Sequence, residues 1–140
     1  MVKASLVILQ GGIAAMRRIN VHDIQEFYRF PKAFVNSDRY KEMSDAAKII
    51  YMLLIDRMKD SLEEKRIDSE GYVYLFFSDS ELSRLTGYGI KKVLNAKREL
   101  ITKRLLRQVH IPSLKETRLY LGDFELDEGV ESNLLEELVL

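Results

Sequence analysis

Basic side chains and one asparagine recur at helical spacing between Ile90 and Lys103. At about 100° per residue, Lys91, Asn95 and Arg98 fall together on one side of a helix, and Lys92 lies at its edge. Lysine and arginine contact phosphates or guanine edges, and an asparagine side chain matches the N6 and N7 atoms of adenine. This side therefore has the chemistry of a helix that enters the major groove of duplex DNA.

The opposite side of the same helix is apolar and is expected to pack on the core. It comprises Ile90, Val93, Leu94, Leu100 and Ile101. Lys97 falls inside this apolar arc. Its methylene stem is therefore expected to cross the edge of the core toward solvent, or else the helix packs less tightly there.

A short helix and a turn precede the basic helix and would position it. Ser78-Asp79-Ser80 provides an N-cap for a helix over residues 81–85, in which Leu82 and Leu85 are expected to face inward. Thr86-Gly87-Tyr88-Gly89 follows as a turn, whose glycines permit a tight reversal between helices. Ser80 and Tyr88 are candidate phosphate contacts from this part of the chain.

Two predicted strands follow the basic helix, over residues 105–111 and 117–121, on either side of a turn at residues 112–116. On this hairpin Lys115 and Arg118 are candidate contacts to the adjacent DNA backbone or minor groove. Residues 84–118 hold ten Lys and Arg but only two acids. Residues 1–118 carry a net charge of +7 and the remaining residues −7, so the net charge of zero hides a basic region. Such asymmetry indicates a nucleic-acid surface next to an acidic connector.

Upstream, the sequence predicts further elements of one domain. A long helix begins after an N-cap at Ser44 and runs to about Lys65. Residues 72–77, rich in aromatic and β-branched side chains, are predicted as a strand, and residues 19–24 as a shorter one. The order of elements predicts an α+β, mainly helical fold: a winged helix-turn-helix with a small antiparallel sheet and a wing hairpin. We expect a disordered extension at 1–18, this domain at 19–121 and an acidic tail or linker at 122–140.

Several other function classes find no support. The chain has no cysteine and only two distant histidines, His22 and His110, so no disulfide, metal site or cofactor is expected. No phosphate-binding loop, nucleophile elbow or zinc-protease motif occurs, and we expect no catalytic residues and no enzyme activity. The apolar run near the N-terminus is interrupted at Gln10-Gly11-Gly12 and is too short to span a bilayer. A cytoplasmic protein without a membrane partner is expected.

Four short motifs, in this order, carry a family resemblance. They are Phe27-Tyr28 with Pro31-Lys32, Leu53-Leu54 with Asp56-Arg57, the polar-capped helix before the glycine turn, and Arg118-Leu119-Tyr120. Over residues 19–121 the chain resembles the N-terminal domain of the plasmid replication initiator protein A (RepA_N) family of Gram-positive plasmids. It departs from the family pattern at Gly89-Ile90-Lys91-Lys92, where relatives often carry Ser, Lys, Asn or Thr, and at Lys97, where an aromatic or aliphatic residue is common.

The resemblance implies a winged helix that binds repeated sites in a plasmid origin, typically as a dimer. It also implies a C-terminal domain, absent from this chain, that engages host replication proteins. We expect a homodimer formed through the N-terminal segment. Two alternatives stay open: a winged-helix transcription regulator that binds an operator, and a protein-interaction winged helix that binds no nucleic acid and uses residues 27–34 as its contact surface.

Overall fold

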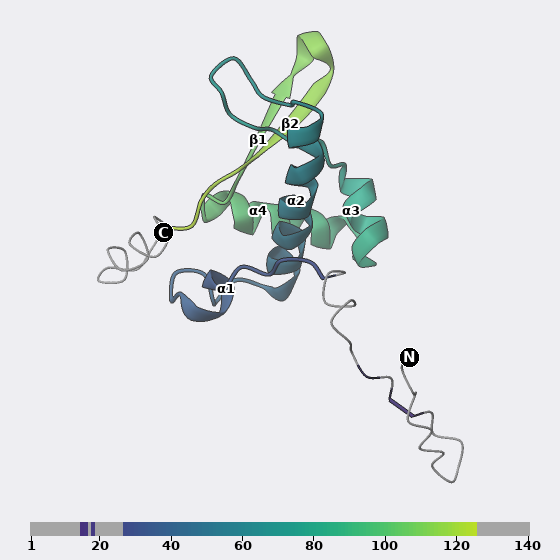
Figure 1. The fold of residues 1–140 in the computed structure, drawn as a ribbon, viewed down its shortest axis with the longest axis vertical. Helices are drawn as coiled ribbons and strands as arrows, with labels where there is room; N and C mark the ends of the chain where they lie inside the picture. Colours follow the sequence, from purple (N-terminus) through teal and green to yellow (C-terminus); the bar gives the residue numbers. More distant parts are fainter. Residues whose placement is uncertain (1–14, 17, 19–26, 126–140) are drawn as a thin grey trace.

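The computed structural model describes residues 15, 16, 18 and 27–125, and in this part four helices precede a two-stranded antiparallel sheet (Figure 1). The elements are α1 (Ala33–Asn36), α2 (Asp45–Glu63), α3 (Asp79–Thr86), α4 (Ile90–Thr102), β1 (Leu106–Ile111) and β2 (Glu116–Leu121). The predicted extension at 1–18, except residues 15, 16 and 18, lies outside the described residues. So do the predicted strand at 19–24 and the acidic tail from residue 126.

Helix α2 is the centre of the domain and crosses α4 (Figure 1). It begins where the sequence predicted, because the Ser44 side chain accepts a hydrogen bond of 3.2 Å from the Ala47 N–H. Glu99 of α4 accepts from the Ser44 N–H at 2.9 Å and from the Ser44 hydroxyl. The start of α2 is therefore tied to the middle of α4.

A single apolar cluster joins the helices to the hairpin. Its most deeply buried large members are Phe34, Tyr40, Ile50, Leu54, Leu75, Leu82, Val93, Leu100, Leu105 and Leu119. Since these residues come from α1, α2, α3, α4, β2 and the intervening segments, burial of one core fixes the orientation of α3, α4 and the hairpin together.

Helix α3 has the N-cap that the sequence predicted, and Gly87 of the predicted turn caps its C-terminus. The Ser78 side chain accepts from the Glu81 N–H at 3.0 Å, and Gly87, at φ 79°, ends the helix by donating to the Ser83 carbonyl at 2.9 Å. Leu82 is fully buried, but Leu85 is exposed, so the prediction that both face inward was wrong for Leu85. The helix has only eight residues, and its contact with the core lies near its middle.

The hairpin of β1 and β2 is the wing, and it projects away from the helices (Figure 1). Leu106 pairs with Leu121 and Ile111 with Glu116, which confirms the predicted antiparallel pairing. A single 3-10 turn at Pro112–Leu114 and Lys115, at φ 52°, close the hairpin. Together with the helices, this sheet confirms the predicted winged helix-turn-helix.

The segment at residues 72–77 is extended but is not the strand that the sequence predicted. Val73 pairs with Ile67, and Leu75 exchanges both backbone hydrogen bonds with Leu119 of β2. Successive residues thus face different partners, so no continuous ladder forms on either side. The segment contributes one residue pair to the edge of the wing.

The folded domain continues past Leu121, where the acidic tail was predicted to begin. The Gly122 N–H donates to the Leu105 carbonyl at 2.9 Å, and its own carbonyl accepts from the Tyr51 hydroxyl at 2.9 Å. The Phe124 ring packs edge-on against Phe34, Tyr40 and Tyr51, with centroid distances of 5.3, 5.1 and 5.3 Å. Packing against the core therefore extends at least to Phe124.

Candidate nucleic-acid interface

Four of the predicted contact residues form one exposed surface on α4. Lys91, Lys92, Asn95 and Arg98 are all exposed, and we call these four residues the basic face. The Arg98 guanidinium donates to the Asn95 Oδ1 at 3.3 Å, so these two side chains are already adjacent. The structure thus brings together two lysines, an arginine and an amide within two turns of one helix.

The buried side of α4 is narrower than predicted. Val93, Ala96, Lys97 and Leu100 are buried. The prediction that Ile90, Leu94 and Ile101 also face the core was wrong, because these side chains are 46%, 38% and 45% exposed. The core contacts one row at steps of three and four residues, whereas these three lie beside that row.

The sequence predicted that Lys97 reaches solvent over the edge of the core, but in the structure it does not. The residue is only 6% exposed, and its Nζ lies 2.6 Å from the Asp79 Oδ1 at the first turn of α3. A buried ammonium needs such a partner, and an aspartate at a helix N-terminus is itself favourably placed. The charge of Lys97 therefore links α4 to α3 and is not part of the basic face.

The turn between α3 and α4 adds an aromatic ring to the surface. The Lys92 Nζ lies 4.3 Å from the centroid of the half-buried Tyr88 ring, a cation–π arrangement that orients the lysine at the start of α4. Ser80 is exposed in the first turn of α3. Ser80 is therefore accessible to a ligand, and Tyr88 is partly accessible.

The two predicted wing residues differ in availability. Lys115 is exposed at the tip of the hairpin. The Arg118 side chain is only 15% exposed: its Nε lies 3.1 Å from Glu116, and its guanidinium lies 4.1 Å from the Tyr74 ring centroid. The structure therefore leaves Lys115 exposed like the basic face but separates Arg118 from it.

Three further basic residues are exposed where α4 meets β1. They are Lys103, Arg104 and Arg107, which the sequence analysis counted among the ten basic residues but did not place in the site.

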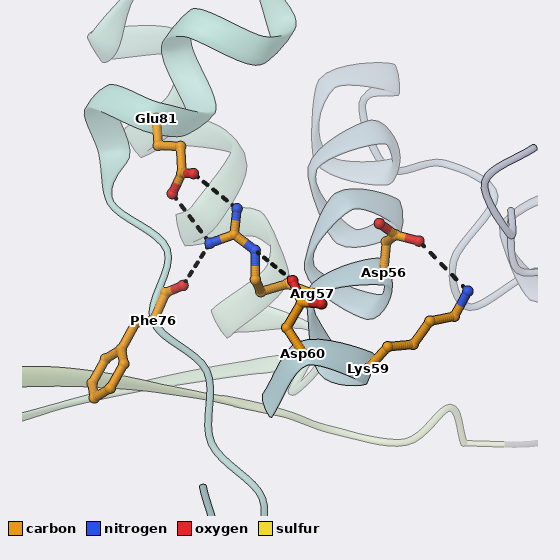
Figure 2. Close-up of polar contacts among 6 residues, drawn as sticks. All are labelled: Asp56, Arg57, Lys59, Asp60, Phe76 and Glu81. Carbon is orange, nitrogen blue, oxygen red and sulfur yellow. Dashed lines mark hydrogen bonds and ion pairs between the residues drawn. The ribbon is translucent and has the colours of Figure 1, made fainter. Parts of the chain in front are cut away.

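Arg57 of α2 holds α3 in place. Its Nη1 and Nη2 donate to the two Glu81 carboxylate oxygens at 3.2 and 2.9 Å, and Nη1 also donates to the Phe76 carbonyl at 3.0 Å (Figure 2). The guanidinium lies 3.8 Å from the Phe77 ring centroid. We call these groups the Arg57 cluster. Hydrogen bonding from Arg57 holds the pKa of Glu81 below its usual value.

The Arg57 cluster was missed from the sequence. In the sequence, Arg57 belonged to a family motif on the long helix and had no assigned partner. Glu81, three residues after a serine N-cap, reads as half of a capping box. In the structure, however, it faces α2 (Figure 2). Pairing between the two is a tertiary contact that local spacing does not reveal.

Residues 26–134 match the family described as "Replication initiator protein A (RepA) N-terminus". The chain belongs to this family. This confirms the resemblance found on the short motifs, and the matched residues include α1 to α4 and the wing.

Solved structures similar to this RepA N-terminal domain support the fold. A structure titled "N-Terminal domain of DNA binding protein" superposes with a TM-score of 0.69 at 26% identity, covering 88% of this chain and 95% of the other. One titled "Structure of MDR initiator" gives 0.67 at 29% identity, covering 87% and 98%. One titled "Structure of Rep-DNA complex" gives 0.67 at 26% identity, covering 89% and 98%.

A sequence relative shows that such a domain occurs within a longer chain. The "41 kDa protein" of Lactobacillus helveticus is 32% identical over a 120-residue alignment that covers 80% of this chain and 34% of that protein. The RepA N-terminal domain thus spans about a third of the length of the curated relative it matches.

Gly89 lies at the start of α4. Gly89 is the N-cap and makes no side-chain cap hydrogen bond. A Cβ added there would meet no atom within 4 Å. The position therefore accepts a serine or threonine without steric conflict, and the glycine leaves the first N–H groups of α4 open toward the surface that carries Lys91 and Lys92.

Among residues 15, 16, 18 and 27–125, no three or more His, Asp or Glu side chains gather in a way that could hold a metal ion. Within the same residues, no helix has the length and apolar character needed to cross a membrane.

Proposed function

We propose that this RepA N-terminal domain binds duplex DNA at repeated sites in a plasmid replication origin. The observation that carries the proposal is the basic face, four exposed polar side chains on the second helix of a helix-turn-helix. Family membership and the likeness to a solved structure titled as a Rep-DNA complex support it. The domain has no enzymatic role in this proposal.

The contacts follow from the geometry of α4 and the wing. Residues 90–98 of α4 enter the major groove, where Lys91 and Lys92 neutralise phosphates and the adjacent Asn95 and Arg98 read base edges. Arg98 matches guanine O6 and N7, and Asn95 matches adenine N6 and N7. Lys115 at the tip of the wing contacts the backbone beside this groove. Ser80 and Tyr88 add phosphate contacts from α3 and the turn.

Charge reversal on the basic face tests the proposal. The probe is a labelled duplex that carries the origin repeats of the plasmid encoding this chain, titrated by fluorescence anisotropy at several salt concentrations. Lys91→Glu with Arg98→Glu is expected to abolish binding, because both substitutions replace attraction to phosphate with repulsion. Lys59→Glu is the control for a single charge reversal away from the basic face: Lys59 is exposed on α2 and lies 3.8 Å from Asp56 (Figure 2).

Unchanged binding by the double variant would refute the assignment of the basic face. Equal loss in the double variant and in the Lys59 control would show a general charge effect instead. Binding to an operator of a neighbouring gene, with no protection of the origin repeats in a footprint, would favour the alternative of a transcription regulator.

Assembly and host contacts are the further parts of the proposal. We infer a homodimer formed through the N-terminal segment, supported by the exposed aromatic side chains of Phe27, Tyr28 and Phe30. Sedimentation that finds only monomers, both free and with a two-repeat duplex, would contradict the dimer. A C-terminal domain outside this chain would contact host replication proteins, in the cytoplasm where the plasmid replicates. If the same aromatic segment captured a protein and no DNA bound, the protein-interaction alternative would hold.

A further inference from the structure

An exposed row of apolar side chains runs along α4 beside the basic face. Its members are Ile90, Leu94 and Ile101, which are between 38% and 46% exposed, and we call them the apolar stripe. At about 100° per residue, steps of four and seven residues place them within about 40° of one another around the helix. The stripe lies between the buried Lys97 and the exposed Arg98.

The apolar stripe does not form part of the core of the domain. Val93, Ala96 and Leu100 fill the contact of α4 with the rest of the protein and are at most 1% exposed. The stripe is also too closely flanked by charge to suit an apolar protein partner, because burying it would strip water from Lys91 and Arg98 without supplying partners. Its occupant must offer apolar groups and negative charge side by side.

The major groove of DNA offers both. Phosphates line its edges, and each thymine places a 5-methyl group on its floor, where apolar side chains can contact it. Resting on the proposed function, we propose that Leu94, together with Ile90, contacts thymine methyl groups and contributes to the choice of DNA sequence. Ile101 lies about 16 Å along the helix from Ile90 and is beyond residues 90–98, the part of α4 that enters the groove.

Uracil substitution tests this contact one methyl group at a time. Uracil pairs as thymine does and lacks only the 5-methyl group. Origin-repeat duplexes with thymine replaced by uracil at single positions compete against the labelled thymine duplex in the anisotropy assay. At the contacted position the wild-type domain is expected to bind the uracil duplex about fourfold more weakly, the effect of exposing roughly one buried methyl group.

A variant cycle assigns the contact to Leu94. Leu94→Ala is expected to bind the thymine duplex several-fold more weakly and to bind the thymine and uracil duplexes equally at that position. Ile101→Ala is the matched control on the same stripe and is expected to keep the wild-type preference for thymine. Thermal unfolding of each variant checks that the substitution leaves the domain folded, as expected for exposed side chains.

The outcomes separate this inference from the proposed function. Normal, salt-sensitive binding with no uracil effect at any position, or an unchanged thymine preference in Leu94→Ala, overturns the methyl contact and leaves DNA binding intact. If the wild-type domain binds no origin duplex at low salt, the proposed function and this inference both fail. A preference that disappears in Leu94→Ala but persists in Ile101→Ala supports the assignment.

Discussion

Removal of Arg57 is expected to loosen α3 from α2 and to lower the stability of the whole domain. The guanidinium donates two hydrogen bonds to Glu81 and one to the Phe76 carbonyl and lies on the Phe77 ring. In Arg57→Ala the Phe76 carbonyl and the Glu81 carboxylate lose their donor. Among the described residues, no other side chain donates a hydrogen bond to either group. The substitution therefore removes more than one surface ion pair.

The magnitude follows from burial. The side chains of Arg57 and Glu81 are 23% and 30% exposed, between a surface pair and a buried one. Exposed pairs contribute about 0.2–1 kcal/mol, whereas breaking a buried pair costs about 3–5 kcal/mol. We therefore expect Arg57→Ala to lower the free energy of unfolding by about 3 kcal/mol. The coupling between Arg57 and Glu81 in a double-mutant cycle should be about 1–2 kcal/mol.

Urea unfolding of the wild type, Arg57→Ala, Glu81→Gln and the double variant measures this coupling. Because the pKa of Glu81 is lowered in the folded state, its contribution is fully present above its ordinary value of 4.5 and is lost as the pH falls through the folded-state value. The wild type should therefore lose more stability below about pH 4.5 than Glu81→Gln does. A coupling below about 0.3 kcal/mol, or identical pH profiles, would refute the role of the Arg57 cluster.

Two other substitutions test the C-cap of α3 and the packing of Phe124. Gly87→Ala should cost about 1 kcal/mol in urea unfolding, because φ at this C-cap is 79°, although no atom lies within 4 Å of the added Cβ; an unchanged midpoint would show that the backbone relaxes. Phe124→Ala should cost about 2–3 kcal/mol, because its ring packs against three aromatic rings but is only partly buried. A truncation after Leu121 as stable as the full chain would contradict the packing of Phe124.

Local signals in the sequence predicted α2, α3, α4 and the wing, but not the four-residue helix α1. Serine caps at 44 and 78, the glycine at 87 and the proline at 112 act through hydrogen bonds and backbone angles near the residue itself. The strand predicted at 72–77 failed because strand formation depends on partners distant in sequence. Its β-branched and aromatic side chains fit an extended segment, but only Leu75 meets β2.

Helical periodicity predicted where the side chains of α4 point better than it predicted how deeply they are buried. It grouped Lys91, Asn95 and Arg98 correctly on the exposed side. It also assigned Leu94 to the core, because hydrophobicity alone does not distinguish an apolar side chain that is buried from one that is exposed at the surface. Leu94 is 38% exposed because Val93 and Leu100 complete the contact of α4 with the core without it.

Charge counting from sequence overstates how many cations can meet DNA, and salt dependence can measure the difference. Of the ten Lys and Arg in residues 84–118, Lys97 and Arg118 are held by Asp79 and Glu116. The basic face supplies Lys91, Lys92 and Arg98, and the wing tip adds Lys115. The other four, Arg84, Lys103, Arg104 and Arg107, are exposed but lie outside the proposed contacts. Since each neutralised phosphate contributes about −0.9 to the slope of log K against log salt, four contacts give about −4 per domain.

Paired methionine substitutions make this argument testable. Lys91→Met should reduce the magnitude of the slope by about 1, because one phosphate contact is lost. Lys97→Met removes the same charge from the same helix but should leave the slope unchanged, since its ammonium is 2.6 Å from Asp79 and faces the protein interior. Binding at several salt concentrations measures both slopes. A wild-type slope near −9, or an equal effect of the two substitutions, would show that DNA binding draws on the whole basic run and not on the basic face and the wing tip alone.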